Sequence, residues 1–253
     1  MSFKIAVAGK GGCGKTSLAA LVIRYLKNHN RVPILAVDAD ANANLGESLG
    51  LEVKQTIGSI LDLFQHEKIS IPQGMTKEAY LEYKLNETIV ESTGIDLVTM
   101  GRGQGPECYC YPNLILKKFI DGLANNYASV VMDNEAGMEH LSRRTTENMD
   151  VLLLVSNHTV KGVRAIAKIK ELVDELKLSF QQQLVVVNLV PGKLNPIVAR
   201  EMEQLGLKAD AIIPEDDELY QFDLKQKRLL DMPETSVAVQ AVNNLMDKVT
   251  SRK

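Results

Sequence analysis

The chain has 253 residues, of which 45% are hydrophobic, and this is enough apolar material to fill the core of one large domain. Its 29 basic and 32 acidic residues give a formal net charge of −3 and are scattered without a cationic block, which argues against nonspecific binding of nucleic acid. No apolar run reaches the ~18 residues of a membrane span and the N-terminus lacks the layout of a signal peptide, so we expect a cytoplasmic protein that binds no membrane.

Short apolar runs alternate with helical patterns along nearly the whole chain, which is typical of βαβ units. The predicted strands are Lys4–Ala8, Ile34–Asp38, Ile95–Met100, Ser129–Asp133, Val151–Ser156, Leu184–Asn188 and Ala211–Pro214. The predicted helices are Lys15–His29, Asn113–Ala124, Val160–Leu176, Pro196–Leu205 and Val237–Thr250. Because the strands are hydrophobic almost throughout, we expect a mostly parallel sheet that is buried on both faces.

Residues 51–91 fit this alternation less well, and we expect them to form an insertion between two strands. Ser59–Gln65 and Lys77–Glu91 have helical patterns, whereas Ile69–Gly74 is typical of a loop. No internal repeat or Pro/Gly/Ser-rich linker indicates a second domain. The predicted fold is therefore a single α/β P-loop NTPase domain over residues 1–253, with a doubly wound sheet of about seven to eight strands.

The motif GKGGCGKTS, Gly9–Ser17, comes directly after the first predicted strand and opens the first predicted helix. It matches G-x-x-x-x-G-K-[ST], the phosphate loop in which backbone N–H groups and a helix N-terminus surround phosphate oxygens. We expect Lys15 to neutralise the β- and γ-phosphates of ATP and Thr16 to offer its hydroxyl to Mg²⁺. The residues expected to contact ATP or ADP here are Gly11, Gly12, Cys13, Gly14, Lys15, Thr16 and Ser17.

A second lysine, Lys10, gives this loop the form K-G-G-x-G-K-[ST]. That form resembles the deviant Walker A motif of the dimeric ATPases that include MinD, ParA, ArsA and the nitrogenase iron protein. The resemblance implies a homodimer in which Lys10 crosses the interface and reaches the phosphates that the partner subunit binds. ATP binding would then favour closure of the dimer.

Acidic residues follow two predicted strands, and the carboxyl ends of strands are where an open α/β sheet binds its ligands. The stretch VDADANANLG resembles switch I of the same ATPases, which implies that Asp40 orients the attacking water and that Asp38 is a ligand of Mg²⁺ or of water. The stretch VVMDNEAG resembles Walker B and switch II. This implies that Asp133 lies near Mg²⁺ through water and that Gly137 faces the γ-phosphate.

Two later positions resemble the adenine contacts of this group, Asn188 in VVVNLVPG and Pro214 in IIPEDDEL. With them, the resemblance extends from the phosphate contacts to the adenine contacts. It implies an enzyme that converts ATP and water to ADP and phosphate, with Lys10, Lys15 and Asp40 as the catalytic residues.

The stretch ECYCYP, Glu107–Pro112, contains two of the three cysteines. Thiols stay reduced in the cytoplasm, so the pair predicts metal binding or redox chemistry, with two structurally unremarkable loop thiols as the alternative. Cys108 and Cys110 can chelate one soft ion, but they supply only half of a four-coordinate site. A two-fold dimer can bring the same pair from each subunit to its axis. Four sulfurs suit tetrahedral Zn²⁺ or square-planar Ni²⁺, and the residues alone do not choose between them.

Together with VDADANANLGESLGL and VVMDNEAGMEHLSR, these motifs resemble the CooC-type nickel-insertion ATPases, which mature carbon monoxide dehydrogenase or acetyl-CoA synthase. The resemblance covers essentially the whole chain. It implies that Cys108 and Cys110 of two subunits hold one nickel ion, which passes to the client enzyme at the expense of ATP; Zn²⁺ fits the same ligands. The motifs do not distinguish the two clients. At Cys13 this family more often has valine, and we expect the thiol to act as a small apolar side chain.

Two other functions are compatible with the nucleotide motifs. An iron–sulfur carrier or reductase of the nitrogenase iron-protein type has a cysteine in switch II, whereas DNEAGMEHLSR has none. Iron–sulfur scaffold ATPases have a close cysteine pair, but in the C-terminal half of the chain. A positioning ATPase that binds membrane or DNA needs a terminal amphipathic helix or a basic surface. The final segment SVAVQAVNNLMDKVTSRK instead predicts a helix that packs on the domain.

Overall fold

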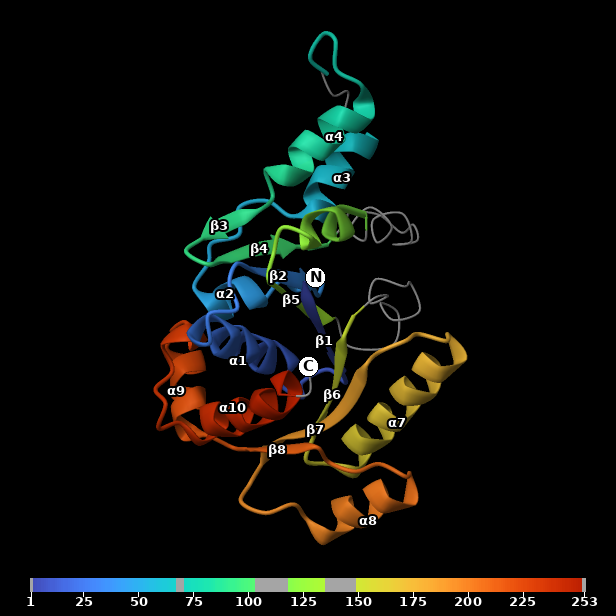
Figure 1. The fold of residues 1–253 in the computed structure, drawn as a ribbon, viewed down its shortest axis with the longest axis vertical. Helices are drawn as coiled ribbons and strands as arrows, with labels where there is room; N and C mark the ends of the chain where they lie inside the picture. The colour runs from blue at the N-terminus through green and yellow to red at the C-terminus, as the bar shows by residue number, and fades with distance from the viewer. Residues whose placement is uncertain (1, 67–70, 103–117, 135–148, 252–253) are drawn as a thin grey trace.

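The computed structural model describes residues 2–66, 71–102, 118–134 and 149–251, which form an α/β domain around an eight-stranded sheet (Figure 1). The strands are β1 Phe3–Gly9, β2 Ile34–Ala39, β3 Val90–Ser92, β4 Ile95–Thr99, β5 Ser129–Asn134, β6 Val151–Asn157, β7 Gln182–Val190 and β8 Ala211–Pro214. Their order is β3-β4-β2-β5-β1-β6-β7-β8, and all pairings are parallel except that of β3 with β4. The predicted fold class is confirmed.

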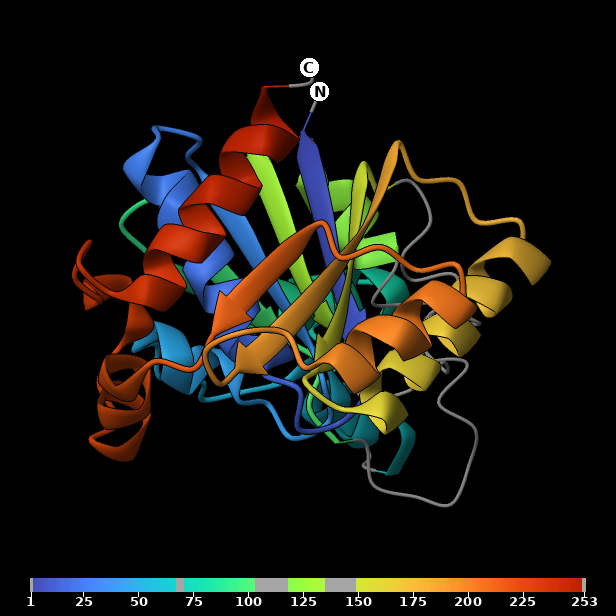
Figure 2. The ribbon, with the colours of Figure 1, turned by 90° about the horizontal axis from the view of Figure 1, so that it is seen from below.

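Helices cover both faces of the sheet, as Figure 2 shows in a view along it. They are α1 Lys15–Asn28, α2 Leu45–Leu49, α3 Ile57–His66, α4 Lys77–Asn86, α7 Val160–Glu175, α8 Pro196–Gln204, α9 Asp217–Leu224, the 3₁₀ turn η1 Leu229–Asp231 and α10 Val237–Thr250. Residues 118–124 are also helical. One core contains α1, α2 and α10, and the other contains α3, α7 and α8. β2 and β5 are buried along their whole length because both of their faces are covered.

The segment between β2 and β4 differs in part from its prediction. The helix expected over residues 77–91 ends at Asn86, and β3 follows it and pairs antiparallel with β4. Thr88, Ile89 and Val90 are β-branched and favour a strand, while Gly94 at φ 77° permits the tight turn into β4. Two short helices, α2 and α9, were not predicted, since each has too few residues for a clear period.

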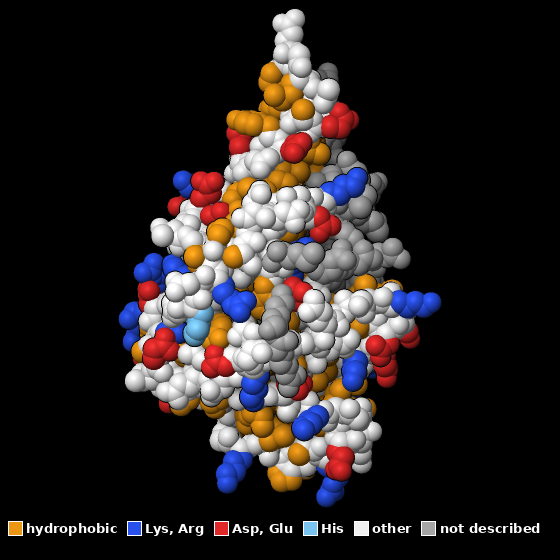
Figure 3. Space-filling view, in the orientation of Figure 1, with side chains coloured by type: hydrophobic (Ala, Val, Ile, Leu, Met, Phe, Trp, Pro, Cys, Tyr) orange, Lys and Arg blue, Asp and Glu red, His pale blue; other side chains and the backbone are white. Residues whose placement is uncertain are grey.

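Helices α3 and α4 project beyond the sheet at one end of the molecule (Figure 1). Apolar side chains lie in solvent on this projection (Figure 3), and among them Leu63 is 39% and Tyr83 is 52% exposed. No helix among the described residues is both long enough and apolar enough to cross a bilayer.

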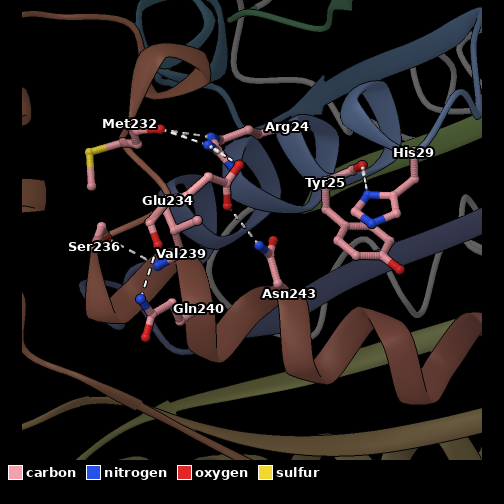
Figure 4. A network of polar contacts seen from close by, with 9 residues as sticks. All are labelled: Arg24, Tyr25, His29, Met232, Glu234, Ser236, Val239, Gln240 and Asn243. Carbon is pink, nitrogen blue, oxygen red and sulfur yellow. Dashed lines mark hydrogen bonds and ion pairs between the residues drawn. The ribbon is translucent and has the colours of Figure 1, made fainter.

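A buried arginine joins α1 to the segment that leads into α10 (Figure 4). Arg24 donates to the carbonyl oxygen of Met232 through Nε at 3.1 Å and Nη2 at 2.7 Å, and it also pairs with Glu234 at 2.7 Å. The side chain of Arg24 is 6% exposed and that of Glu234 is 64% exposed. Water therefore screens the ion pair, and the buried hydrogen bonds to Met232 contribute most of the stabilisation.

Replacing Arg24 by methionine is expected to lower the free energy of unfolding by about 2–3 kcal/mol, because the buried carbonyl of Met232 loses its charged donor. Urea unfolding measures the change. Arg200→Met, on the exposed surface of α8, is the matched control and should change the stability by less than about 0.5 kcal/mol. Equal stabilities of the two variants would contradict the structural role of Arg24.

Candidate nucleotide-binding site

The glycine-rich loop lies at the point where the order of the strands reverses. The chain passes from β1 to β2 on one side of the sheet, and later from β5 across to β6 on the other side of β1. Clefts that bind ligands form at the carboxyl ends of strands at such a point. The loop ends at Gly14, whose φ of 79° is left-handed, and α1 begins at Lys15. The N-terminus of a 14-residue helix thus opens onto the loop.

The loop exposes its first residues and buries its last ones. Lys10, Gly11 and Gly12 are exposed, whereas Lys15 is only 7% exposed. The Nζ atom of Lys15 lies 3.3 Å from the carbonyl oxygen of Lys10, so the side chain folds back across the loop. A cation is therefore held over the backbone that is expected to surround phosphate, and Lys10 is free to reach outward.

Cys13 is enclosed beneath the loop and is 1% exposed. Its Sγ atom donates to the carbonyl oxygen of Val155 at 3.3 Å, and its own carbonyl accepts from Nδ2 of Asn188 at 2.9 Å. Burial raises the pKa of the Cys13 thiol, with nearby Lys15 opposing the effect. A buried thiol with a raised pKa is a poor nucleophile and a poor metal ligand.

Two buried aspartates lie where the strands end, near the start of α1. Thr16 Oγ1 donates to Asp133 Oδ2 at 2.6 Å, and Asp133 is the register partner of Asp38 in the pairing of β5 with β2. Asp133 is 1% and Asp38 0% exposed. Burial raises the pKa of Asp133 to about 7 and that of Asp38 to about 6.

These groups fit a magnesium ion. Asp133 Oδ1 is buried and has no hydrogen-bond partner among the described residues, so one carboxylate oxygen is left for a ligand. The hydroxyl of Thr16 lies beside it, and Mg²⁺ prefers oxygen ligands of these two kinds. A divalent cation would also offset the cost of burying the carboxylate charge.

Two carboxylates hold the loop after β2 in shape by accepting hydrogen bonds from within it. Asp38 Oδ1 accepts from the backbone N–H of Asp40 at 3.1 Å, and its Oδ2 accepts from that of Leu45 at 2.8 Å. Asp40 Oδ1 in turn accepts from the backbone and side-chain nitrogens of Asn42 at 2.8 and 3.0 Å. Ala43 has a φ of 57°, which is uncommon for a residue with a side chain. Asp38 therefore shapes this loop, while Asp40 stays half-buried at its surface.

A cleft of about 440 Å³ adjoins the loop on the side away from Asp133. It is lined by Gly12, Gly14 and Ser17 of the loop and α1, by Leu189, and by residues between 215 and 223 that include Tyr220. Asn188 and Pro214 do not line the cleft themselves, although the residue after each of them does. Leu189, near the end of β7, and Tyr220, in α9, were missed from the sequence.

The wall of this cleft is anchored by Asp216. Its carboxylate caps α9 by accepting from the backbone N–H groups of Glu218 and Leu219, and it holds the start of α10 by accepting from Ser236 Oγ and the N–H of Ala238. Partial burial raises the pKa of Asp216, but these hydrogen bonds outweigh it and lower the pKa overall. One carboxylate thus orients two helices beside the cleft.

A family model described as the CobQ/CobB/MinD/ParA nucleotide binding domain matches residues 4–229. The chain belongs to this family. Its relatives include an uncharacterized ATP-binding protein of Methanocaldococcus jannaschii, which is 40% identical over 98% of this chain and 99% of its own length. The carbon monoxide dehydrogenase accessory protein CooC of Rhodospirillum rubrum is 28% identical over 68% of this chain and 70% of its own length.

Solved structures of MinD proteins superpose on nearly the whole chain. The cell division ATPase MinD of Pyrococcus furiosus matches with a TM-score of 0.74 at 20% identity and covers 100% of both chains. The septum site-determining protein MinD of Pyrococcus horikoshii, complexed with Mg-ADP, matches with a TM-score of 0.73 at 20% identity, over 98% of this chain and 96% of its own. At these identities the matches establish the fold.

Three of the predicted site residues lie outside the described residues: Cys108, Cys110 and Gly137. In the part of the chain that the structure describes, no group of three or more His, Cys, Asp and Glu side chains is arranged to hold a metal ion. The nickel or zinc site and the γ-phosphate contact therefore stay predictions.

Proposed function

We propose that this chain is a homodimeric ATPase that uses ATP to load nickel into a client enzyme, carbon monoxide dehydrogenase or acetyl-CoA synthase. The observation that carries the ATPase part is the contact of Thr16 with Asp133 beside the glycine-rich loop. It joins the hydroxyl and the carboxylate that a Mg-nucleotide requires, at the N-terminus of α1. In a turn that binds no cation, the free-energy cost of burying this carboxyl group would have no compensation.

In this proposal each part of the site has one task. Backbone N–H groups of residues 11–17 and the ammonium group of Lys15 bind the phosphates, and Lys10 reaches the phosphates of the partner subunit. Thr16 would hold Mg²⁺ directly and Asp133 would hold it through water, and the ion when bound would neutralise charge on the phosphates. Asp40 orients the attacking water, and the cleft beside Gly12 and Gly14 receives the nucleoside.

The nickel part of the proposal rests on Cys108 and Cys110 and on the similarity to CooC. Two C-x-C pairs in a two-fold dimer supply four thiolates, a set of soft ligands that suits Ni²⁺ and also Zn²⁺. Nickel is the cargo of the protein in this scheme, and zinc competes for the same ligands.

Contacts of switch I support a coupling between the two parts. The backbone N–H of Met100 donates to the carbonyl of Asp38 at 2.8 Å, and Arg102 Nη2 donates to Asn42 Oδ1 at 3.3 Å. Met100 and Arg102 stand just before the stretch that contains the cysteines. We therefore expect loss of the γ-phosphate to loosen switch I, to alter the cysteine pair and to release nickel to the client.

Metal titration tests the proposal. The purified dimer is titrated with Ni²⁺ and with Zn²⁺, with and without a nonhydrolysable ATP analogue, for the wild type, Cys108→Ala and Cys110→Ala. We expect one ion for two chains, lost in either variant, with ATP hydrolysis retained. Tyr109→Phe, between the two cysteines, is the control and should bind metal normally. Undiminished binding in both cysteine variants would overturn the nickel assignment and leave the ATPase assignment standing.

A positioning ATPase is the second candidate, because the superposed structures include MinD proteins. Binding to a membrane surface through α10 is not favoured, since its apolar residues Val242, Leu245 and Met246 are buried in the core that contains α1. An iron–sulfur carrier is distinguished by colour: visible absorption with labile sulfide in the purified protein would favour it over nickel insertion.

A further inference from the structure

Asn188 lies directly beneath the glycine-rich loop. The residue is 4% exposed, and its Nδ2 atom donates to the carbonyl oxygen of Cys13 at 2.9 Å. A Cβ atom built on Gly14 would stand only 2.4 Å from the same Nδ2 atom. The loop thus rests on this amide, and a larger residue at position 14 would collide with it.

An irregularity in β7 adjoins this contact. The pairing of β7 with β8 shifts register between Val187 and Val190, and Leu189 adopts a φ of 56°. A left-handed φ is uncommon for leucine, so the surrounding structure must impose it. Asn188 stands on the same face of β7 as Val186, which packs in the core with α1, so ordinary alternation directs it beneath the loop. The irregularity instead accounts for Leu189, which lines the neighbouring cleft.

The hydrogen bond from Asn188 to the Cys13 carbonyl also orients a backbone N–H of the loop. In a trans peptide the C=O and the following N–H point in opposite directions. The bond between Cys13 and Gly14 is trans, since the described residues have a cis peptide only at Val32–Pro33. By holding the Cys13 carbonyl from below, Asn188 therefore turns the Gly14 N–H away from the sheet. The thiol of Cys13, bound to Val155 on β6, fixes the same residue from a second strand.

We propose that Asn188 is a positioning residue for polyphosphate binding, which preorganises the Gly14 N–H through the Cys13 carbonyl. This goes beyond the adenine contact expected of Asn188 and rests on the proposed ATPase function. If Asn188 has this role, replacing it should lower the affinity even for ligands that have phosphates but no base. It also links β7, beside the nucleoside cleft, to the loop that grips the phosphates.

Calorimetric titration with Mg-ATP and with magnesium tripolyphosphate, which lacks a nucleoside, tests this role. Asn188→Ala is expected to weaken both ligands about tenfold, because one buried hydrogen bond is lost. Asn188→Asp places a carboxylate oxygen against the Cys13 carbonyl and should weaken both ligands more strongly than alanine does. Asn195→Asp is the matched control: Asn195 Oδ1 caps α8 by accepting from Ile197, and aspartate caps equally well, so both affinities should stay unchanged.

Arg24→Met separates a loss of stability from a loss of positioning, because it weakens the fold through contacts to Met232 and Glu234 that do not involve the loop. At a temperature where circular dichroism shows each variant to be folded, Arg24→Met should keep wild-type affinity for tripolyphosphate and Asn188→Ala should not. Normal tripolyphosphate affinity in folded Asn188→Ala, with weakened ATP binding, would overturn the positioning role and leave only a base contact. If the wild type binds neither ligand, the proposed ATPase function itself fails.

Discussion

Replacing Asp40 by asparagine is expected to lower the rate of ATP hydrolysis about 10²- to 10⁴-fold while ATP binding is retained. Asparagine keeps the side-chain oxygen that accepts from Asn42, so the loop after β2 should keep its shape. What it loses is the carboxylate that we expect to orient the attacking water. The effect should therefore fall on the chemical step and not on nucleotide affinity.

Single-turnover phosphate release measures the chemical step, and titration with a nonhydrolysable ATP analogue measures binding. Glu52→Gln removes an exposed carboxylate from the segment after α2 and is the control, which should leave both quantities unchanged. Wild-type turnover by Asp40→Asn would show that another group orients the water, and Asp38 and Asp133 would then be the residues to replace.

Replacing Asp133 by asparagine is expected to stabilise the protein without ligand and to abolish its response to Mg-nucleotide. The pKa of Asp133 is raised to about 7 by burial, from an ordinary value of 3.8. Above pH 7 the buried carboxylate is ionised and lowers the free energy of unfolding; as the pH falls towards 4 it takes up a proton and this cost disappears. At about 1.4 kcal/mol for each of the roughly three pKa units, the cost at pH 8 is on the order of 4 kcal/mol.

Urea unfolding at pH 5 and pH 8, without nucleotide or divalent metal, measures this prediction. Asp133→Asn should be more stable than the wild type at pH 8, and the difference should fall to about 40% of that value at pH 5, since it vanishes only near the unfolded pKa of 3.8. Asp38 has a raised pKa too, but it is present in both proteins and cancels in the comparison. Mg-ATP should raise the stability of the wild type alone. A variant that is less stable than the wild type at pH 8 would show that the ionised carboxylate has a compensating partner.

Most of the strands could be predicted because each is an uninterrupted apolar run, and the central ones are buried on both faces. β8 has the predicted bounds, Ala211–Pro214, and the predicted run Leu184–Asn188 is the centre of β7. β3 could not be predicted in the same way. It has three residues on the edge of the sheet, and their pairing with β4 outweighs the helical pattern that precedes them.

The candidate site, too, could be predicted where its residues are adjacent in the chain and not where they come together only in the fold. The motif Gly9–Ser17 is local, and its chemistry follows from glycines and from the start of a helix that are adjacent in the chain. The cleft lining is not local, because Leu189 faces it only through a register shift in β7 that no residue pattern announces. Asn188 was expected to touch adenine, and its hydrogen bond to the loop was not foreseen.

The sequence by itself determined that a phosphate loop follows the first strand, that two later strands end in carboxylates, and that two cysteines stand one residue apart. These are properties of neighbouring residues. Only the tertiary structure decided which of them meet: Thr16 and Asp133 are 117 residues apart in the chain, and Asn188 and Cys13 are 175 apart. The parallel register of β1, β2 and β5 aligns their carboxyl ends at one edge of the sheet, and burial there turns a strand-end aspartate into a carboxyl group with a raised pKa.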